Sequence, residues 1–220
     1  MKKIHNLIIV DESGSMCSIE KQAVSGMLET IQSIKASQQK TPDHVQTITL
    51  LTFNSQHLDF VYNCSLVDSV DPFSIRYMPS GCTPLYDAIG KGISLIKEVA
   101  DKGDVVIVTI ITDGYENASS HYSLNQIKRL IEQQKEMGWT VALIGTDDLD
   151  VGSMARSMSI SDHLSFSKDE RTTLAMFSKL TQARDNRICM AVEDGAVCCA
   201  SQPFFDTDSL SSDDVDSIGR

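Results

Sequence analysis

Five oxygen-bearing side chains stand out in this sequence because they fall at the ends of predicted strands and at the start of a predicted helix. They are Asp11, Ser13, Ser15, Thr83 and Asp113. The first three alternate with other residues, so they point toward one small volume, and Gly14 allows a tight turn between the serines. Hard oxygen ligands suit Mg²⁺, Mn²⁺ or Ca²⁺, whereas Zn²⁺ and copper favour His and Cys. The pattern predicts a divalent-cation site, with Mg²⁺ as the expected metal.

The make-up of this ligand set indicates binding rather than catalysis. Its two carboxylates offset the charge of a divalent cation without exceeding it, and the other three donors are neutral hydroxyls. Mg²⁺ takes about six ligands and usually keeps some waters, so the coordination sphere has room for one oxygen from outside. We therefore expect a protein partner to supply an acidic side chain, and we expect no enzymatic activity.

The residues around these side chains alternate between strand-like and helix-like patterns. Apolar, β-rich runs predict strands at residues 4–10, 45–53, 104–112, 140–145 and 163–166, and an alternating run predicts an antiparallel edge strand at 57–66. Amphipathic stretches predict helices at 20–37, 84–102 and 150–158. Two more helices should follow capping boxes that begin at Ser123 and Ser167, and should end near Met137 and Asp185. Thr83 is the expected N-cap of the second helix.

Strands that alternate with helices predict an α/β fold, a doubly wound and mostly parallel sheet with helices on both faces. We expect the Rossmann-like strand order 3-2-1-4-5-6, with the antiparallel strand at one edge. That order places the strand ending at Val10 beside the strand ending at Thr112, and the winding direction reverses between them. Open α/β sheets bind ligands outside the carboxyl ends of the strands at such a point. The predicted cation site therefore lies where this fold places its ligands.

Length and composition indicate one domain with an appendage. The chain has 220 residues, which predicts one domain over residues 1–185 and an acidic extension over residues 186–220. The extension carries seven acidic against two basic side chains. Its last stretch, residues 206–220, is expected to be disordered, whereas residues 188–205 are expected to pack as a strand or hairpin.

The net charge limits the classes of partner that the chain could bind, and the cysteines indicate the compartment in which it works. A net charge of −11 argues against a nucleic-acid partner and against an anionic membrane surface. No apolar run reaches the roughly 18 residues of a membrane span. The six cysteines are irregularly spaced and indicate reduced thiols. These features predict a cytoplasmic protein.

The motifs resemble the metal-ion-dependent adhesion site of von Willebrand factor A domains. The match rests on Asp11-x-Ser13-x-Ser15, on Gly81-Cys82-Thr83-Pro84-Leu85 and on Thr112-Asp113-Gly114, which occur in the family's order. It covers roughly residues 1–185, and the departures are Cys82, which stands where a second glycine is usual, and the acidic tail. The chain is most similar to compact bacterial and phage members that lack extra domains.

This resemblance implies a role for each of the five side chains. It implies that Ser13, Ser15 and Thr83 bind the metal through their hydroxyls. It also implies that Asp11 and Asp113 bind directly or through water, and that an acidic side chain of a partner completes the sphere. Some relatives serve with chaperone-like ATPases or in stress operons, so the resemblance implies a partner of that kind.

A Mg²⁺-dependent phosphatase of the haloacid dehalogenase type is the alternative. Such enzymes also carry an Asp at the end of the first strand, but they need a second Asp two residues later, where this chain has Ser13. Among the neighbouring residues, Glu12 is expected to be solvated and Cys17 to be buried. Asp87 is expected to complement a helix dipole, and Asn117 to satisfy loop backbone groups.

Overall fold

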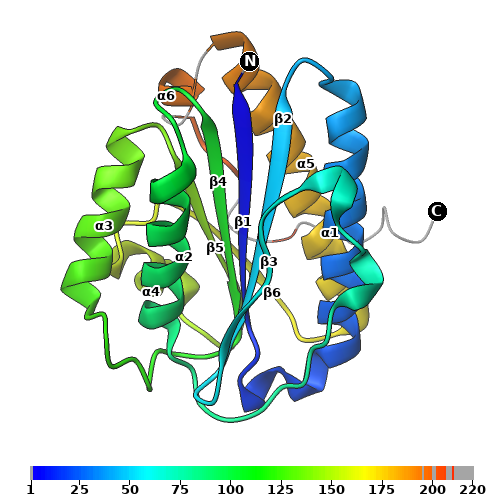
Figure 1. Cartoon of the computed structure of the whole chain (residues 1–220). Helices are drawn as coiled ribbons and strands as arrows, with labels where there is room; N and C mark the ends of the chain where they lie inside the picture. The colour runs from blue at the N-terminus through cyan, green and yellow to red at the C-terminus, as the bar shows by residue number, and fades with distance from the viewer. Residues whose placement is uncertain (1, 195, 200–201, 207–209, 211–220) are drawn as a thin grey trace.

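The computed structural model describes residues 2–194, 196–199, 202–206 and 210. Its centre is a six-stranded sheet of order β3-β2-β1-β4-β5-β6 (Figure 1). Neighbouring strands are parallel except β2 and β3, which are antiparallel. The strands are β1 (Lys3–Asp11), β2 (Val45–Phe53), β3 (Leu58–Leu66), β4 (Val105–Thr112), β5 (Thr140–Thr146) and β6 (Asp162–Phe166). The predicted fold class, strand order and antiparallel edge strand are confirmed.

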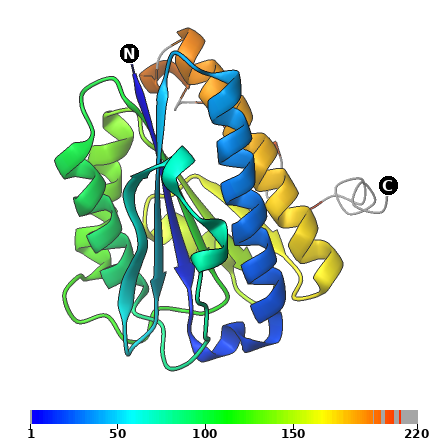
Figure 2. The same cartoon turned by 45° about the vertical axis from the view of Figure 1, so that its right-hand side comes forward.

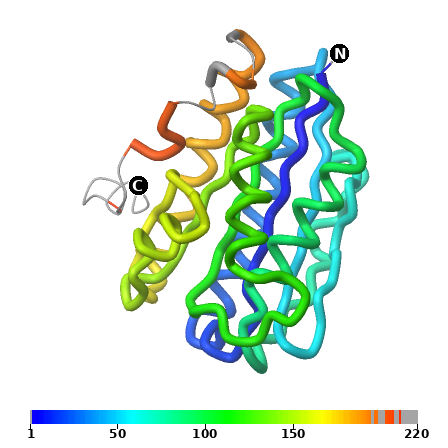
Figure 3. The backbone as a smooth tube through the Cα atoms, turned by 90° about the vertical axis from the view of Figure 1, so that its left-hand side faces the viewer, coloured from blue at the N-terminus to red at the C-terminus, as the bar shows by residue number. Residues whose placement is uncertain are grey.

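Helices cover both faces of the sheet, as Figure 2 shows. On one face lie α1 (Glu20–Lys40) and α5 (Glu170–Asp194), and on the other lie α2 (Leu85–Val99), α3 (Leu124–Glu136) and α4 (Val151–Ser157). Figure 3 shows the second layer from its own side. The remaining helical pieces are the 3₁₀ turns η1 (Gly14–Ile19), η2 (Val67–Ser69) and η3 (Pro72–Ser74) and the short α6 (Ala196–Cys199). Within the described ranges, no helix combines the length and the apolar character that a membrane crossing requires.

The central strands are buried on both faces because their side chains point alternately into two hydrophobic cores. In β1, Ile8 and Val10 pack toward α1 and α5, whereas Leu7 and Ile9 pack toward α2 and α3. All eight residues of β4 are buried, as expected for a parallel strand with helices on both faces. This double burial explains the unbroken apolar runs in the sequence.

The ends of β1 and β4 meet at the carboxyl edge of the sheet, which is the lower edge in Figure 1. Val10 of β1 pairs with Ile111 of β4, and Asp11 pairs with Phe53 of β2. Residues that follow these strands therefore leave the sheet side by side. This register, together with the reversal of winding between β1 and β4, sets the position of the candidate site.

Several predicted helix ends differ from the structure. Thr83 does not cap α2, which begins at Leu85 without any side-chain cap hydrogen bond. The predicted capping box at Ser123 is present. At the start of α5 the capping residue is Asp169 rather than Ser167, because the backbone N–H of Thr172 donates to Asp169 Oδ1 at 2.9 Å.

The C-terminal part of the chain is helical where a strand or hairpin was expected. Helix α5 continues past Asp185 to Asp194, and α6 follows it, so both the helix end and the predicted hairpin were wrong in the described residues. Phe204 and Phe205 are buried in the core on the α1–α5 face, and the Phe204 N–H donates to Asp162 Oδ1 at 2.7 Å. The expected disorder of residues 206–220 falls almost wholly outside the described residues.

Helices α1 and α5 approach each other closely at Gly26, where we expect substitution to destabilise the fold. A Cβ atom at Gly26 would lie 2.0 Å from the Phe177 ring, and Phe177 is fully buried, so Gly26→Ala should lower the free energy of unfolding by about 1–3 kcal/mol through overpacking. Urea denaturation measures this loss.

Gly152→Ala in α4 is the matched control for this test. Its added Cβ would first meet the end of the flexible Arg156 side chain, at 3.1 Å, and alanine favours the helix by up to about 1 kcal/mol. Equal stabilities of the Gly26→Ala and Gly152→Ala proteins would show that α1 and α5 do not pack as described.

Candidate metal centre

The structure brings the five predicted oxygen donors together at the carboxyl edge of the sheet. Asp11 ends β1, Ser13 and Ser15 lie in the turn that begins η1, Thr83 precedes α2, and Asp113 follows β4. Gly114 lies among them. A Cβ atom on Gly114 would be 3.0 Å from Thr83 Oγ1, 3.6 Å from Ser15 Oγ and 3.7 Å from Asp11 Oδ2. Three donors from two separate segments thus surround a residue of a third segment.

Hydrogen bonds link the remaining donors to this cluster. Ser13 Oγ lies 3.1 Å from Ser15 Oγ, and the Ser15 hydroxyl donates to Asp113 Oδ1 at 2.5 Å. Ser13 makes no side-chain hydrogen bond that would cap η1, and Thr83 makes none that would cap α2. The hydroxyls therefore belong to the oxygen cluster rather than to helix capping.

Asp11 is the most deeply buried member, with no exposed surface. It accepts hydrogen bonds from the Ser13 N–H at 2.7 Å and from the Thr112 hydroxyl at 2.6 Å. Burial raises the pKa of Asp11 to about 6, the negative charge of Asp113 acts in the same direction, and the two hydrogen bonds oppose the rise. In the absence of a cation, this carboxylate is therefore held in an environment that disfavours its charge.

Asp113 has a positively charged neighbour that sequence reasoning missed. Its Oδ2 atom lies 3.0 Å from Lys168 Nζ, and the same ammonium lies 3.0 Å from Asp148 Oδ2. Asp113 Oδ2 is buried and has no well-directed hydrogen bond within the described ranges, so its contact with Lys168 is an ion pair. Burial alone would lower the pKa of Lys168, but the two carboxylates raise it above its ordinary value.

The loop between β4 and α3 fixes the backbone of Thr83. The Thr83 N–H donates to Asn117 Oδ1 at 2.8 Å, and the Asn117 N–H donates to the Thr83 carbonyl at 3.1 Å. The predicted role of Asn117 in satisfying backbone groups is confirmed, and the group it satisfies belongs to a residue of the cluster. Thr83 is thereby joined to the loop that carries Asp113 and Gly114.

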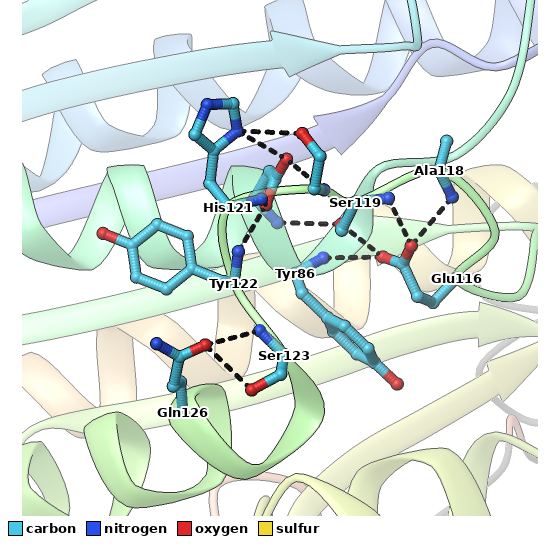
Figure 4. Close-up of polar contacts among 10 residues, drawn as sticks. Tyr86, Glu116, Ala118, Ser119, His121, Tyr122, Ser123 and Gln126 are labelled. Carbon is cyan, nitrogen blue, oxygen red and sulfur yellow. Dashed lines mark hydrogen bonds and ion pairs between the residues drawn. The ribbon is translucent and has the colours of Figure 1, made fainter.

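Two further carboxylates, Glu116 and Asp87, join this loop to the first turn of α2, and Figure 4 shows the contacts of Glu116. Glu116 accepts hydrogen bonds from the backbone N–H groups of Tyr86 at 2.9 Å, Ala118 at 2.8 Å and Ser119 at 2.7 Å.

Asp87 accepts hydrogen bonds from the backbone N–H groups of Ser120, His121 and Tyr122. Burial acts to raise the pKa of Asp87, but these bonds hold it below its ordinary value. The predicted structural role of Asp87 is confirmed, although it anchors a loop rather than complementing a dipole alone.

Glu12 and Cys17 differ from their predicted environments. Glu12 is buried rather than solvated, because it lies between the His57 imidazole, whose Nε2 is 2.9 Å from Glu12 Oε2, and the backbone N–H of Met78. Glu12 thereby joins the end of β1 to the turn that precedes β3 and to the loop that leads to Thr83. Cys17 is exposed rather than buried, so the predicted packing role was wrong.

The cluster offers two carboxylates and three hydroxyls as possible cation ligands and no imidazole or thiolate. In the part of the chain that the structure describes, no three His, Cys, Asp or Glu side chains gather as a metal-ligating group. Any cation here would therefore rely on the neutral hydroxyl oxygens of Ser13, Ser15 and Thr83 as well as on the two carboxylates. Such a donor set is suited to a hard cation.

Because the pKa of Asp11 is raised, the stability of the metal-free protein should depend on pH. The folded state holds this proton more tightly than the unfolded chain, so the contribution of Asp11 to stability is full near pH 4 and is lost as the pH rises through about 6. Asp11→Asn should therefore be more stable than the parent protein at pH 7.5 in EDTA, by on the order of 2–3 kcal/mol. The difference should vanish near pH 4, and urea unfolding at both pH values measures it.

The hydrogen bonds of Asp11 permit this substitution. Thr112 Oγ1 also lies 3.1 Å from the Gly114 carbonyl, so its hydroxyl can donate there and accept from an asparagine amide. Asp68→Asn, at an exposed position, is the control and should show no such pH-dependent gain. A less stable Asp11→Asn protein at pH 7.5 would contradict the described environment of Asp11.

Solved structures with the same fold come from several bacterial proteins. The D319A mutant of the PilB minor pilin from Streptococcus sanguinis has a TM-score of 0.58 and 14% identity, and the match covers 86% of this chain and 62% of that one. A von Willebrand factor type A protein from Catenulispora acidiphila has a TM-score of 0.59 and 14% identity, over 82% of this chain and 42% of that one. The vWF domain of the type V pili tip protein Mfa5 from Porphyromonas gingivalis has a TM-score of 0.61 and 10% identity, over 84% and 96%.

These similarities establish the fold, and the chain spans less than two thirds of the first two proteins. No curated protein sequence matches the chain. The family model of the von Willebrand factor type A domain matches residues 7–182. The chain therefore belongs to the von Willebrand factor type A domain family.

Proposed function

We propose that this chain is a divalent-cation-dependent protein-binding module, in which Mg²⁺ held at the carboxyl edge recognises an acidic side chain of a partner. The observation that carries the proposal is the convergence of Asp11, Ser15 and Thr83 oxygens around Gly114, with Ser13 and Asp113 joined to them. Mn²⁺ or Ca²⁺ would fit the same class of ligands.

The residues present fit such a cation. All five donors are hard oxygens, and Asp113 Oδ2 is a buried carboxylate oxygen without a well-directed hydrogen bond from the described residues. Ser13, Ser15, Thr83, Asp11 and Asp113 would hold the metal. When bound, the metal would supply an electrophilic centre that attracts an oxygen ligand from outside the chain.

The charge balance favours recognition over catalysis. Two carboxylates offset a divalent cation, and the three hydroxyls add no further negative charge, so the bound ion keeps its attraction for an external carboxylate. The phosphatase alternative finds no support in the family to which the chain belongs. Two of the similar structures are pilus proteins, which supports a binding role for the present chain.

Exposed apolar side chains border the site and would enlarge the contact with a partner. Tyr115 follows Asp113 and Gly114 and is 50% exposed, and Met78, on the loop that leads to Thr83, is 74% exposed. Apolar and aromatic side chains around a central polar contact are typical of protein interfaces. The partner would thus combine an acidic side chain with an apolar surface.

The partner and compartment of the chain are part of the same proposal. Four cysteines, Cys17, Cys64, Cys82 and Cys189, are free thiols, which supports a reducing, cytoplasmic location. A cytoplasmic partner such as a chaperone-like ATPase or a protein of a stress operon agrees with the resemblance that the sequence carries. The net charge of −11 supports neither a nucleic acid nor an anionic membrane as the ligand.

Thr83 offers the sharpest test of the cation site, because its hydroxyl can be removed with little change of shape. Thr83→Val should weaken Mg²⁺ binding at least about tenfold, the lower end of what is lost when even a hydrogen-bond partner of a metal ligand is removed. Thr83→Ser keeps the hydroxyl and should bind within a few-fold of the parent protein. Isothermal titration calorimetry with MgCl₂ and MnCl₂ measures both variants.

The same pair of variants tests recognition of a partner. In pull-downs from the native cell, EDTA and Thr83→Val should each remove the captured protein, and Thr83→Ser should retain it. Capture that survives both EDTA and Thr83→Val would overturn a cation-dependent binding function.

A further inference from the structure

Lys168 is the one described ammonium that forms an ion pair with a residue of the candidate metal site. Its Nζ atom lies 3.0 Å from Asp113 Oδ2 and 3.0 Å from Asp148 Oδ2. The Asp113 side chain has no exposed surface, whereas that of Asp148 is 57% exposed. The ammonium therefore joins a buried carboxylate of the site to a second carboxylate that water can reach.

The segments on both sides of this ion pair are held in place. Asp169, next to Lys168, caps α5 by accepting from the Thr172 N–H at 2.9 Å, and the Thr172 hydroxyl donates to the Ser167 carbonyl at 2.6 Å. Asp148 accepts a hydrogen bond from the hydroxyl of Thr146, at the end of β5. The position of the ammonium is thus built into two loops rather than left to a mobile surface side chain.

The Asp147 backbone strengthens the link between these loops. Its N–H donates to the carbonyl of Phe166, the last residue of β6, at 2.8 Å. This bond joins the loop that carries Asp148 to the loop that carries Lys168. The structure shows the ammonium shared between Asp113 and Asp148, so a Lys168 side chain displaced from Asp113 would still have Asp148 as its partner.

We infer that Lys168 is an internal competitor of the metal, a cation that occupies Asp113 in the metal-free protein and must yield when a divalent cation binds. This inference rests on the proposed function and deepens it. A divalent cation and an ammonium on one carboxylate repel each other, and the complete burial of the Asp113 side chain limits the screening of this repulsion by solvent. Lys168 thereby weakens metal binding and sets the cation concentration at which the site becomes competent for a partner.

The same ion pair has the opposite effect on the metal-free protein. Without metal, Asp11 and Asp113 are two buried carboxylates in one cluster, and Asp113 already acts to raise the pKa of Asp11. Lys168 offsets part of this charge. Removing the ammonium should lower stability in EDTA and increase metal affinity at once, a combination that a purely structural role for Lys168 would not produce.

Lys168→Met tests the inference in the full-length chain. Calorimetric titration with MgCl₂ should give a dissociation constant at least about tenfold lower than that of the parent protein. In EDTA the melting temperature should fall, and saturating Mg²⁺ should raise it by more than it raises that of the parent. Lys168→Arg keeps the charge and should retain the affinity of the parent within a few-fold.

Lys91→Met is the control for loss of one positive charge, because Lys91 is exposed on α2 and makes no described contact with the site. It should leave Mg²⁺ affinity unchanged within about twofold, as expected for an exposed charge that salt screens. Equal or weaker Mg²⁺ binding by Lys168→Met would overturn the competitor role while leaving the proposed cation site intact. Absence of Mg²⁺ binding in both the parent and Lys168→Met would overturn the inference together with the proposed function.

Discussion

Two buried carboxylates at the same edge of one sheet need positive charge nearby, and this electrostatic constraint shapes the whole site. Asp11 and Asp113 end up together because β1 and β4 are neighbours on which the winding of the sheet reverses. Burial raises the pKa of Asp11, and the Lys168 ammonium lies against Asp113. The fold thus places two negative charges in a buried position where a bound cation would be stabilising. This electrostatic balance is the physical basis for proposing metal-dependent recognition.

Both charged and neutral side chains hold the loops around the site through hydrogen bonds. Asp87 and Glu116 are carboxylates whose oxygens are used by backbone N–H groups of the β4–α3 loop, so they hold shape rather than a cation. Asn117 binds the backbone N–H of Thr83 and so joins Thr83 to the β4–α3 loop. Glu12 accepts from the backbone N–H of Met78 and so holds the loop that precedes Thr83. The donor oxygens that face Gly114 are therefore held by hydrogen bonds that do not depend on a bound metal.

Much of this arrangement follows from the sequence, because it depends on local patterns and on the rule that ligands bind at the switch point. The five oxygen donors, the order of the strands and the structural role of Asp87 were all predicted. Lys168 was missed because its partner, Asp113, lies far away in sequence, and a lysine in a loop is ordinarily solvated. The prediction for Glu12 was wrong because its contact with His57 is a tertiary feature that no local pattern indicates. The predicted end of α5 was wrong for a similar reason, because Ile188 and Ala191 in its last turns are buried in the core.

The central claim is that a divalent cation binds among these five oxygens. A crystal structure grown with Mn²⁺, with its anomalous difference map, tests this claim most directly. The account predicts an anomalous peak beside Gly114, about 2.0–2.3 Å from the hydroxyl oxygens of Ser13, Ser15 and Thr83, with Lys168 withdrawn from Asp113. A map without a peak at this edge at saturating Mn²⁺, or with a peak only elsewhere on the chain, would contradict it.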